Sequence, residues 1–244
     1  MPAPRKKKQR GFWNKEYSRA AARQGGAGHT RLALSDEPSE DLLKFCRWIE
    51  RQHGRKLFNI TSQVVDCGCG NGRNIIYISQ NYQMRGLGYD LSNAAIEEAR
   101  RAAEGLPLTF KVQALADPIP LPDNSCMLAL DMMSSHVLNR AQRENLRTEV
   151  LRVLKPGGWF FFRSFLLDED RHAARLLRDN PAEEPGMYIH PEIGIPEYVW
   201  TEEALEEFFS PFFTIHKIER SHRHVHKDGT PWKRRTITAY LEKQ

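Results

Sequence analysis

The stretch Val-Val-Asp-Cys-Gly-Cys-Gly-Asn-Gly-Arg-Asn, residues 64–74, constrains the fold more than any other part of the chain. A β-branched pair, which favours a strand, leads directly into an aspartate and three glycines. Glycine leaves the main chain bare, so a ligand or another segment can approach it closely. A strand, a glycine-rich turn and a helix in this order are typical of the carboxyl edge of an open α/β sheet, where such folds bind ligands. The stretch therefore predicts a ligand site; the alternative is a turn that only serves helix packing.

The spacing of these glycines narrows the class of ligand. A dinucleotide-binding turn needs a further glycine at position 73, where this chain carries Arg73. The spacing therefore favours a nucleoside without a pyrophosphate and argues against a nicotinamide-dependent oxidoreductase. The next predicted strand ends in Asp90, 22 residues after Gly68. A carboxylate there can accept hydrogen bonds from both hydroxyls of a ribose, whereas capping the following helix is its alternative role.

From Gln63 onward, short apolar runs alternate with amphipathic stretches, which is typical of strand-helix units stacking into a parallel sheet. Two helices are expected before the glycine-rich turn, at 12–23 and 38–53. The predicted strands are 64–67, 84–89, 108–113, 127–132 and 159–164, and the predicted helices between them are 71–80, 93–104 and 141–153, with Ser92 as an N-cap. Near the C-terminus, segments 212–225 and 233–242 are predicted to form a hairpin through the Asp228-Gly229 tip.

The segment 180–200 interrupts this regular pattern with prolines, glycines and aromatic rings. It is too rich in rings for an inert linker and too broken for one helix, so we expect a loop that covers a ligand cleft; a plain surface connection is the alternative. Tyr188 and His190 from this loop are assigned to the substrate side. Thr201 is predicted to cap the helix that follows.

The formal charge of +5 is concentrated at the N-terminus. Five of the 36 basic residues lie between Arg5 and Arg10, and the remaining 31 balance the 31 acidic residues. This distribution predicts a disordered basic tail over residues 1–11, followed by one domain over 12–244. The tail either has no partner or contacts RNA, the ribosome or another anionic surface. No apolar run reaches the roughly 18 residues of a membrane span, so we expect no membrane span and a cytoplasmic protein.

The cysteines and histidines do not predict a metal site. Cys67 and Cys69 form a single Cys-x-Cys pair with no second pair at zinc-site spacing, so reduced thiols are expected. His222, His224 and His226 alternate along an extended segment and share one face. Because no partner carboxylate is evident, a polar sheet face is favoured over a metal-binding face.

Four motifs occur in a fixed order: Asp66-x-Gly68-x-Gly70-x-Gly72, Gly88-x-Asp90-x-Ser92, Ala116-Asp117 before Leu121-Pro122-Asp123, and Leu154-Lys155-Pro156-Gly157-Gly158. In this combination the chain resembles the class I S-adenosylmethionine-dependent methyltransferases over about residues 60–165. The resemblance implies a Rossmann-like, doubly wound α/β fold. Its sheet would have seven strands, mostly parallel with an antiparallel C-terminal hairpin, in three α/β/α layers.

The resemblance also implies S-adenosyl-L-methionine as the cofactor and gives roles to individual residues. The three glycines would pass under its methionine and ribose parts, and Asp66 would reach the amino group through water. Asp90 would hold the ribose, and Asp117 would accept from the adenine amine, unless it is an ordinary loop aspartate. The cofactor-binding set is completed by Leu91, against the adenine ring, and Asp131.

Methyl transfer is an in-line displacement, so the protein must hold a nucleophile about 3 Å from the methyl carbon with water excluded. His136, after the fourth predicted strand, is a candidate to take a proton from that nucleophile; otherwise it packs at a helix start. Arg163 on the fifth strand faces either an anionic substrate group or a structural ion-pair partner. A small-molecule acceptor is expected, and the alternatives are methylation of RNA or protein, or a module that binds the cofactor without transferring a methyl group.

Overall fold

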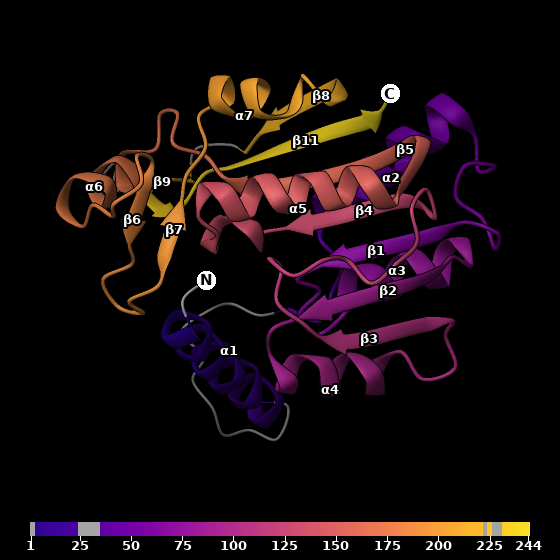
Figure 1. Cartoon of the computed structure of the whole chain (residues 1–244), viewed down its shortest axis with the longest axis horizontal. Helices are drawn as coiled ribbons and strands as arrows, with labels where there is room; N and C mark the ends of the chain where they lie inside the picture. The colour runs from indigo at the N-terminus through magenta and orange to yellow at the C-terminus, as the bar shows by residue number, and fades with distance from the viewer. Residues whose placement is uncertain (1–2, 24–34, 222–223, 226–230) are drawn as a thin grey trace.

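The computed structural model describes residues 3–23, 35–221, 224–225 and 231–244 (Figure 1). Its centre is a seven-stranded sheet with the order β3-β2-β1-β4-β5-β11-β8. The strands are β1 Gln63–Cys67, β2 Arg85–Asp90, β3 Leu108–Val112, β4 Cys126–Met132, β5 Leu154–Phe165, β8 Phe213–Arg220 and β11 Thr236–Lys243. Strands β1 to β5 are parallel, and β11 lies antiparallel between β5 and β8. The predicted fold class and its reversed C-terminal hairpin are confirmed.

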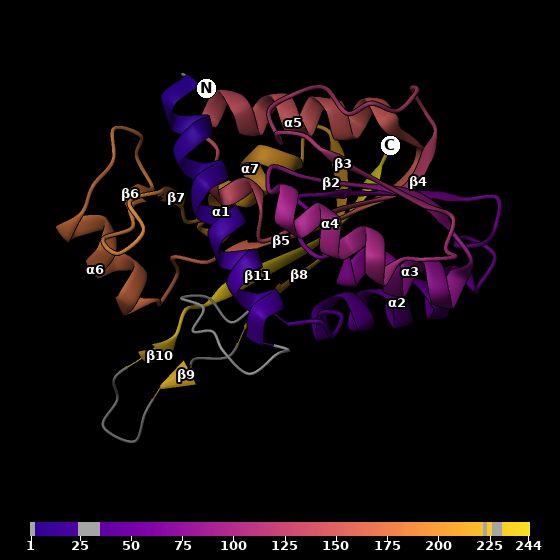
Figure 2. The same cartoon turned by 90° about the horizontal axis from the view of Figure 1, so that it is seen from below.

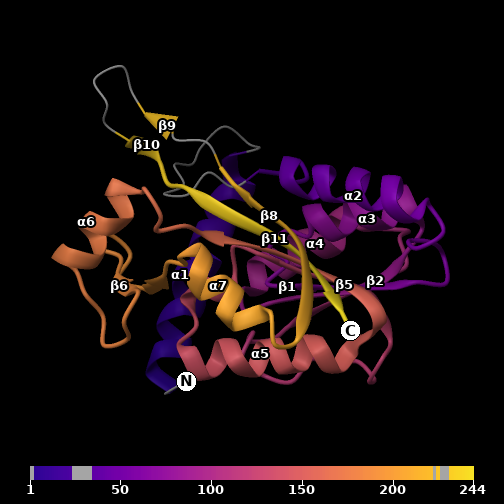
Figure 3. The same ribbon diagram turned by 90° about the horizontal axis from the view of Figure 1, so that it is seen from above.

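Helices cover both faces of the sheet, as the views from below and above show (Figures 2 and 3). On one face lie α2 Glu40–His53, α3 Arg73–Tyr82 and α4 Asn93–Ala102, and on the other lie α5 Arg140–Val153 and α7 Glu202–Phe209. Successive side chains of a strand point to opposite faces of the sheet and so divide the core into two parts. Val64 packs with α2, α3 and α4, whereas Val65 packs with α5 and α7. The sheet is therefore buried on both faces, as an α/β fold of this kind requires.

The helix caps predicted from the sequence are confirmed. Ser92 Oγ accepts a hydrogen bond from Ala95 N at the start of α4, and Thr201 Oγ1 accepts one from Ala204 N at the start of α7. Strand β5, in contrast, begins at Leu154, five residues before its predicted start. Leu154 pairs with Cys126 of β4, and this long-range pairing extends the strand through the Pro-Gly-Gly sequence.

The N-terminus differs from the predicted disordered tail. Helix α1 runs over Ala3–Arg23, so residues 3–11 form its first half. Buried Gln9 and Glu16 face the protein, and Phe12 packs against the core. Asn14 Oδ1 accepts from Ser92 Oγ at 2.8 Å and from Ala94 N at 3.4 Å, which docks α1 on the start of α4. The predicted helix over 12–23 is therefore present but begins earlier, at Ala3, and tertiary contacts of this kind stabilise it.

The predicted covering loop contains a small hairpin of its own. Strands β6 Met187–Ile189 and β7 Pro196–Tyr198 pair antiparallel and follow α6 Arg171–Asp179. Figure 1 shows this hairpin beyond the arrowheads of the parallel strands, on the side of the sheet where α1 lies. A second pair, β9 His224–Val225 and β10 Pro231–Lys233, extends the C-terminal hairpin. The predicted Asp228-Gly229 tip lies outside the described residues, as do His222 and His226 of the histidine face.

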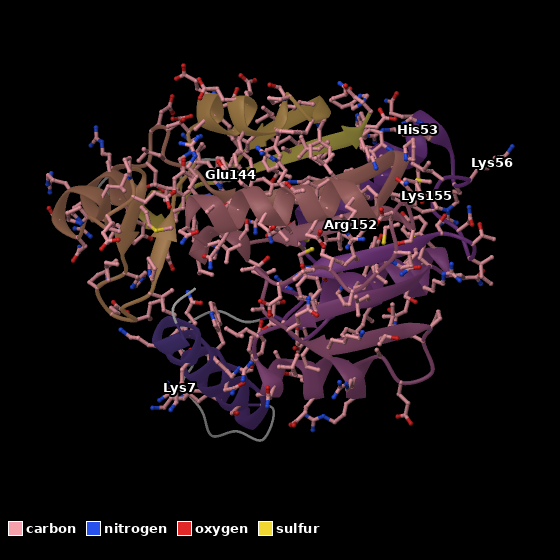
Figure 4. The ribbon with its side chains drawn as sticks, viewed as in Figure 1. Lys7, His53, Lys56, Glu144, Arg152 and Lys155 are labelled. Carbon is pink, nitrogen blue, oxygen red and sulfur yellow. The ribbon has the colours of Figure 1, made fainter. Side chains whose placement is uncertain are left out.

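The loop before β4 is anchored by α5. The Arg152 guanidinium donates to the carbonyl oxygens of Ile119 and Leu121 and to the carboxylates of Asp123 and Glu149. Figure 4 shows Arg152 on α5, and Lys7 extending from α1 away from the sheet. Within the described part of the chain, no helix is long and apolar enough to cross a membrane.

Candidate functional site

One cavity of about 370 Å³ lies at the carboxyl end of the parallel strands. Its first wall comes from the ends of β1 and β2, with Gly68, Asp90 and Leu91, and from the segment 114–116 after β3. Its second wall follows β4 and β5 and contains Met132, His136, Arg163 and Phe165, among others. Helix α1 and the β6–β7 hairpin close the space with Gln9, Trp13, Tyr17, Ile193 and Glu197. The cavity is where the sequence predicts it, at the carboxyl edge of an open sheet.

Asp90 is held rigidly at this edge. Its Oδ2 accepts from Gly70 N at 3.1 Å, and its Oδ1 accepts from Ser92 N at 2.8 Å. Burial raises the pKa of Asp90, whereas the N–H donors of Ser92 and Gly70 oppose that shift. Because a carboxylate oxygen has two lone pairs, each oxygen retains acceptor capacity for a ligand in the cavity. Asp90 thus links the glycine-rich turn to the start of α4.

The three glycines of the turn all have positive φ angles, but they face different neighbours. A β-carbon on Gly68 would collide with Ser134, and one on Gly70 would collide with the hydroxyl of Tyr17. A β-carbon on Gly72 would lie 3.1 Å from both Ala99 and Phe110. Of the three, only Gly68 lines the cavity, whereas Gly72 lets the start of α3 pack closely against α4 and β3. The turn therefore contributes both to the cavity and to helix packing, the two alternatives that the sequence left open.

Asp66 and Asp131 lie under the cavity and not in its wall. Burial, with the nearby carboxylates of Asp131 and Asp90, raises the pKa of Asp66 to about 8. Asp131 Oδ1 accepts from Ser134 Oγ at 2.6 Å and from Ser135 N at 3.1 Å. The Asp131 carboxylate thus holds the turn after β4, and its assignment to the cofactor stays a prediction.

Three side chains of α1 that the sequence did not single out line the cavity: Gln9, Trp13 and Tyr17. Gln9 is only 3% exposed, and its Nε2 has no hydrogen-bond partner among the described residues. Burial, with Asp90 nearby, raises the pKa of Tyr17, so its hydroxyl stays protonated. The sequence did contain a signal for these three residues. They are spaced by four, which places them on the same face of a helix.

His136 lies in a short 3-10 helix, Ser135–Val137, directly after β4. It is 5% exposed, and its ring packs edge-on against Phe165 with the centroids 5.0 Å apart. Burial lowers the pKa of His136 to about 4, although Glu197 acts in the opposite direction. The imidazole is therefore neutral at neutral pH and has a lone pair with which to accept a proton.

Glu197 on β7 is the second titratable group of this wall. Its Oε1 lies 3.9 Å from His136 Nε2, and its Oε2 accepts from Arg234 Nη1 at 2.7 Å and from the Tyr188 hydroxyl. Tyr188 is fully buried behind the wall, so it reaches the cavity only through Glu197. Its assignment to the substrate side stays a prediction. His190 lies outside the cavity wall as well, where its Nδ1 accepts from Glu192 N.

Arg163 lines the cavity and is paired with a carboxylate. Its Nε lies 2.8 Å from Asp41 Oδ2 of α2, so the structural ion pair is the arrangement observed. Asp117 follows the lining residue Ala116 but is not itself part of the wall, and its role at an adenine amine stays a prediction. The four cysteines are all buried and free. Among the described residues, no three His, Cys, Asp or Glu side chains cluster as a metal site would require.

Comparison with known proteins agrees with this geometry. A family described as a methyltransferase domain matches residues 64–158. The fatty-acid O-methyltransferase of Mycolicibacterium smegmatis is 35% identical over 101 residues, 41% of this chain and 36% of that protein. An O-methyltransferase of Aspergillus nomiae is 27% identical over 148 residues, 58% of this chain and 65% of that protein. The chain thus spans less than two thirds of the length of each of these relatives.

The fold matches over nearly the whole chain. A methyltransferase structure from Anabaena variabilis superposes with a TM-score of 0.63 at 19% identity and covers 98% of this chain and 95% of its own. That similarity extends to α1 and the C-terminal hairpin, which lie outside the matched sequence segment. A methyltransferase domain therefore matches residues 64–158, and nearly the whole chain has the fold of a solved S-adenosylmethionine-dependent methyltransferase.

Proposed function

We propose that this protein transfers the methyl group of S-adenosyl-L-methionine to an oxygen nucleophile of a small, largely apolar acceptor. The observation that carries the proposal is that Gly68, Asp90 and Leu91 line one wall of a cavity whose other wall contains His136 and Glu197. The cofactor supplies an electrophilic methyl group on its sulfonium. The residues of the two walls then have separate tasks, cofactor binding and acceptor binding.

The first wall suits the adenosyl part of the cofactor. Asp90 keeps an acceptor site on each oxygen and would hold the ribose hydroxyls. Leu91, Ala114 and Leu115 supply apolar surface for an adenine ring. The bare α-carbon of Gly68 lets the main chain approach the ligand at the end of β1. These groups are fixed by the sheet itself, so they are in place before a ligand binds.

The second wall suits the apolar, uncharged part of an acceptor molecule. Met132, Val137, Leu138, Phe165 and Ile193 make it largely apolar. Its charged groups are compensated, because Arg163 pairs with Asp41 and Glu197 pairs with Arg234. Neutral His136 would accept the proton of an acceptor hydroxyl, while the apolar surroundings exclude water.

Two further observations favour a small acceptor over RNA or protein. Helix α1 and the β6–β7 hairpin both contribute to the cavity wall, so the site is bounded on several sides and has a volume of about 370 Å³, which suits a small acceptor. The relatives from Mycolicibacterium smegmatis and Aspergillus nomiae are named as O-methyltransferases, the first acting on fatty acids. We extend the oxygen nucleophile to this chain and use a fatty acid as one of two test acceptors.

The test uses binding first and turnover second. Calorimetry with S-adenosylhomocysteine should show one site, and radiolabelled S-adenosyl-L-methionine should then label decanoic acid or 4-pentylphenol but not total RNA. Labelling of RNA with both small acceptors left unlabelled would overturn the acceptor class. Absence of any binding at millimolar S-adenosylhomocysteine would overturn the function as a whole.

A further inference from the structure

We propose that Glu197 is a positioning residue for His136, with Tyr188 and Arg234 fixing the glutamate so that one oxygen faces the imidazole. The proposal rests on the proposed function, since it assigns the groups that prepare His136 to take a proton. Three separate parts of the chain meet here: the turn after β4, the β6–β7 hairpin and the segment before β11. Only His136 lies inside the segment that matches the methyltransferase family.

The two oxygens of Glu197 have different surroundings. Oε2 accepts from the Tyr188 hydroxyl and from Arg234 Nη1 at 2.7 Å, which fixes the orientation of the carboxylate. Oε1 is turned to the other side and lies 3.9 Å from His136 Nε2. Glu197 is 6% exposed and lines the cavity, so this oxygen acts with little screening by solvent.

Arg234 is itself held in place by aromatic rings. Its guanidinium carbon lies 3.3 Å from the ring centroid of Phe165 and 5.3 Å from that of Tyr188. Phe165 also packs against His136, so one ring contacts both the cation and the imidazole. The carboxylate of Glu197 therefore cannot turn away from His136 without breaking two hydrogen bonds, those from Tyr188 and Arg234.

The arrangement leaves one nitrogen of His136 for the acceptor. Nε2 is on the side of Glu197, and for Nε2 to accept a proton the neutral ring carries its own proton on the buried Nδ1. When an acceptor O–H bond breaks, the proton forms an N–H bond at Nε2 and the electron pair stays on the acceptor oxygen. The imidazolium then carries a positive charge beside the negative charge of Glu197, which offsets the cost of charging a buried ring.

The charged groups that act on His136 are Glu197 from the hairpin and Arg234 from the segment before β11. Glu197 favours the charged imidazole, and Arg234 and burial oppose it. Removing the glutamate charge should therefore make His136 harder to protonate, whereas removing the arginine charge should make it easier. Glu184, in the same segment but paired with Arg143 outside the cavity, provides a matched control.

The first experiment needs no acceptor. Full-length protein labelled with ¹⁵N-histidine and saturated with S-adenosylhomocysteine is titrated by NMR, with His136→Asn to assign the signal. We expect Glu197→Gln to shift the His136 nitrogen signals and extend its neutral form to lower pH, Arg234→Gln to move its protonation to higher pH, and Glu184→Gln to leave the signals unchanged. His136 signals that are the same in wild type and Glu197→Gln would overturn the proposal, whatever the outcome for the proposed function.

Turnover adds a second readout. Decanoate is already ionised at pH 7.5 and needs no proton acceptor, whereas 4-pentylphenol does. Glu197→Gln should lower kcat for 4-pentylphenol at least tenfold and leave kcat for decanoate within twofold, and Glu197→Asp should recover part of the loss. An equal loss on both acceptors would indicate a merely structural role and overturn the proposal. Wild-type protein that methylates neither compound would count against the proposed acceptor class, and the NMR titration would still decide the role of Glu197.

Discussion

Tyr17 of α1 places its hydroxyl against the bare α-carbon of Gly70, so the N-terminal helix covers the glycine-rich turn directly. Gly70 has a φ of +56°, a left-handed conformation that side chains with a β-carbon rarely adopt. The turn therefore depends on glycine for two reasons, its own backbone and the approach of α1. This contact joins a residue of the family pattern to one that lies far outside it.

Gly70→Ala should destabilise the protein by about 1–2 kcal/mol, because it adds backbone strain and displaces the Tyr17 hydroxyl. In a Tyr17→Phe background the cost should be smaller, giving a coupling energy on the order of 0.5–1 kcal/mol in a double-mutant cycle measured by urea denaturation. Gly11→Ala is the control, since a β-carbon on Gly11 meets no atom of the described residues within 4 Å and Gly11 is an exposed position of α1. Gly11→Ala should stabilise the protein slightly. If the free-energy changes of Tyr17→Phe and Gly70→Ala are fully additive, the contact between these two residues is contradicted.

Asp90→Asn should weaken the binding of S-adenosylhomocysteine by about 1.5–3 kcal/mol, a loss of roughly ten- to a hundred-fold in affinity, because charge-assisted hydrogen bonds to the ribose are lost. Isothermal titration calorimetry measures this directly. Asp179→Asn, at the exposed end of α6, removes the same charge away from the cavity and should bind like wild type. A dissociation constant for Asp90→Asn within error of wild type would rule out the ribose role.

Asp66→Asn should stabilise the protein increasingly as the pH rises from about 4 to 8. Burial raises the pKa of Asp66 to about 8, so the folded state keeps a proton there that the unfolded state has released above its own lower pKa. This contribution to stability is fully present below the unfolded pKa and is lost as pH rises through 8, with a slope of at most about 1.4 kcal/mol per pH unit. Urea denaturation of both proteins at pH 5 and pH 8 checks the sign, and a gap that does not widen at pH 8 would contradict it.

Gln9→Met should raise the thermal unfolding temperature of the unliganded protein. The Gln9 side chain is buried, and its Nε2 donates to no group in the described residues, which costs about 1–3 kcal/mol that a methionine of similar shape avoids. In Gln113→Met, by comparison, a real hydrogen bond to Pro118 O is lost, so no stabilisation is expected. A lower unfolding temperature for Gln9→Met would show that the amide is satisfied in the folded protein.

The sequence predicted well whatever depends on local pattern. The run from β1 through the glycine-rich turn into α3, the Ser92 and Thr201 caps and the antiparallel C-terminal strands all lie close to their predicted positions. Each depends on a period of two or of 3.6, or on a cap within three residues, and such signals are written in neighbouring positions. The placement of Asp90 and Leu91 in the cavity wall follows for the same reason, because parallel strands end at one edge.

The acceptor side could not be predicted in this way. His136 was identified from its place after β4, but Glu197 was one residue in a broken segment, and Tyr188 was expected in the wall that it supports from behind. The partner of Arg163 is Asp41, more than a hundred positions away along the chain. Periodicity says which face of an element is buried, but it does not say which distant charge that face will meet.

By itself, then, the sequence determined the sheet, the glycine-rich edge and the place of Asp90 in the cavity wall, because those features follow from local backbone preferences and the direction of parallel strands. Only the tertiary structure decided how α1, the β6–β7 hairpin and Arg234 close the cavity around His136. These contacts join segments with no shared pattern, and they depend on complementary shape and charge that appear only once the chain has folded.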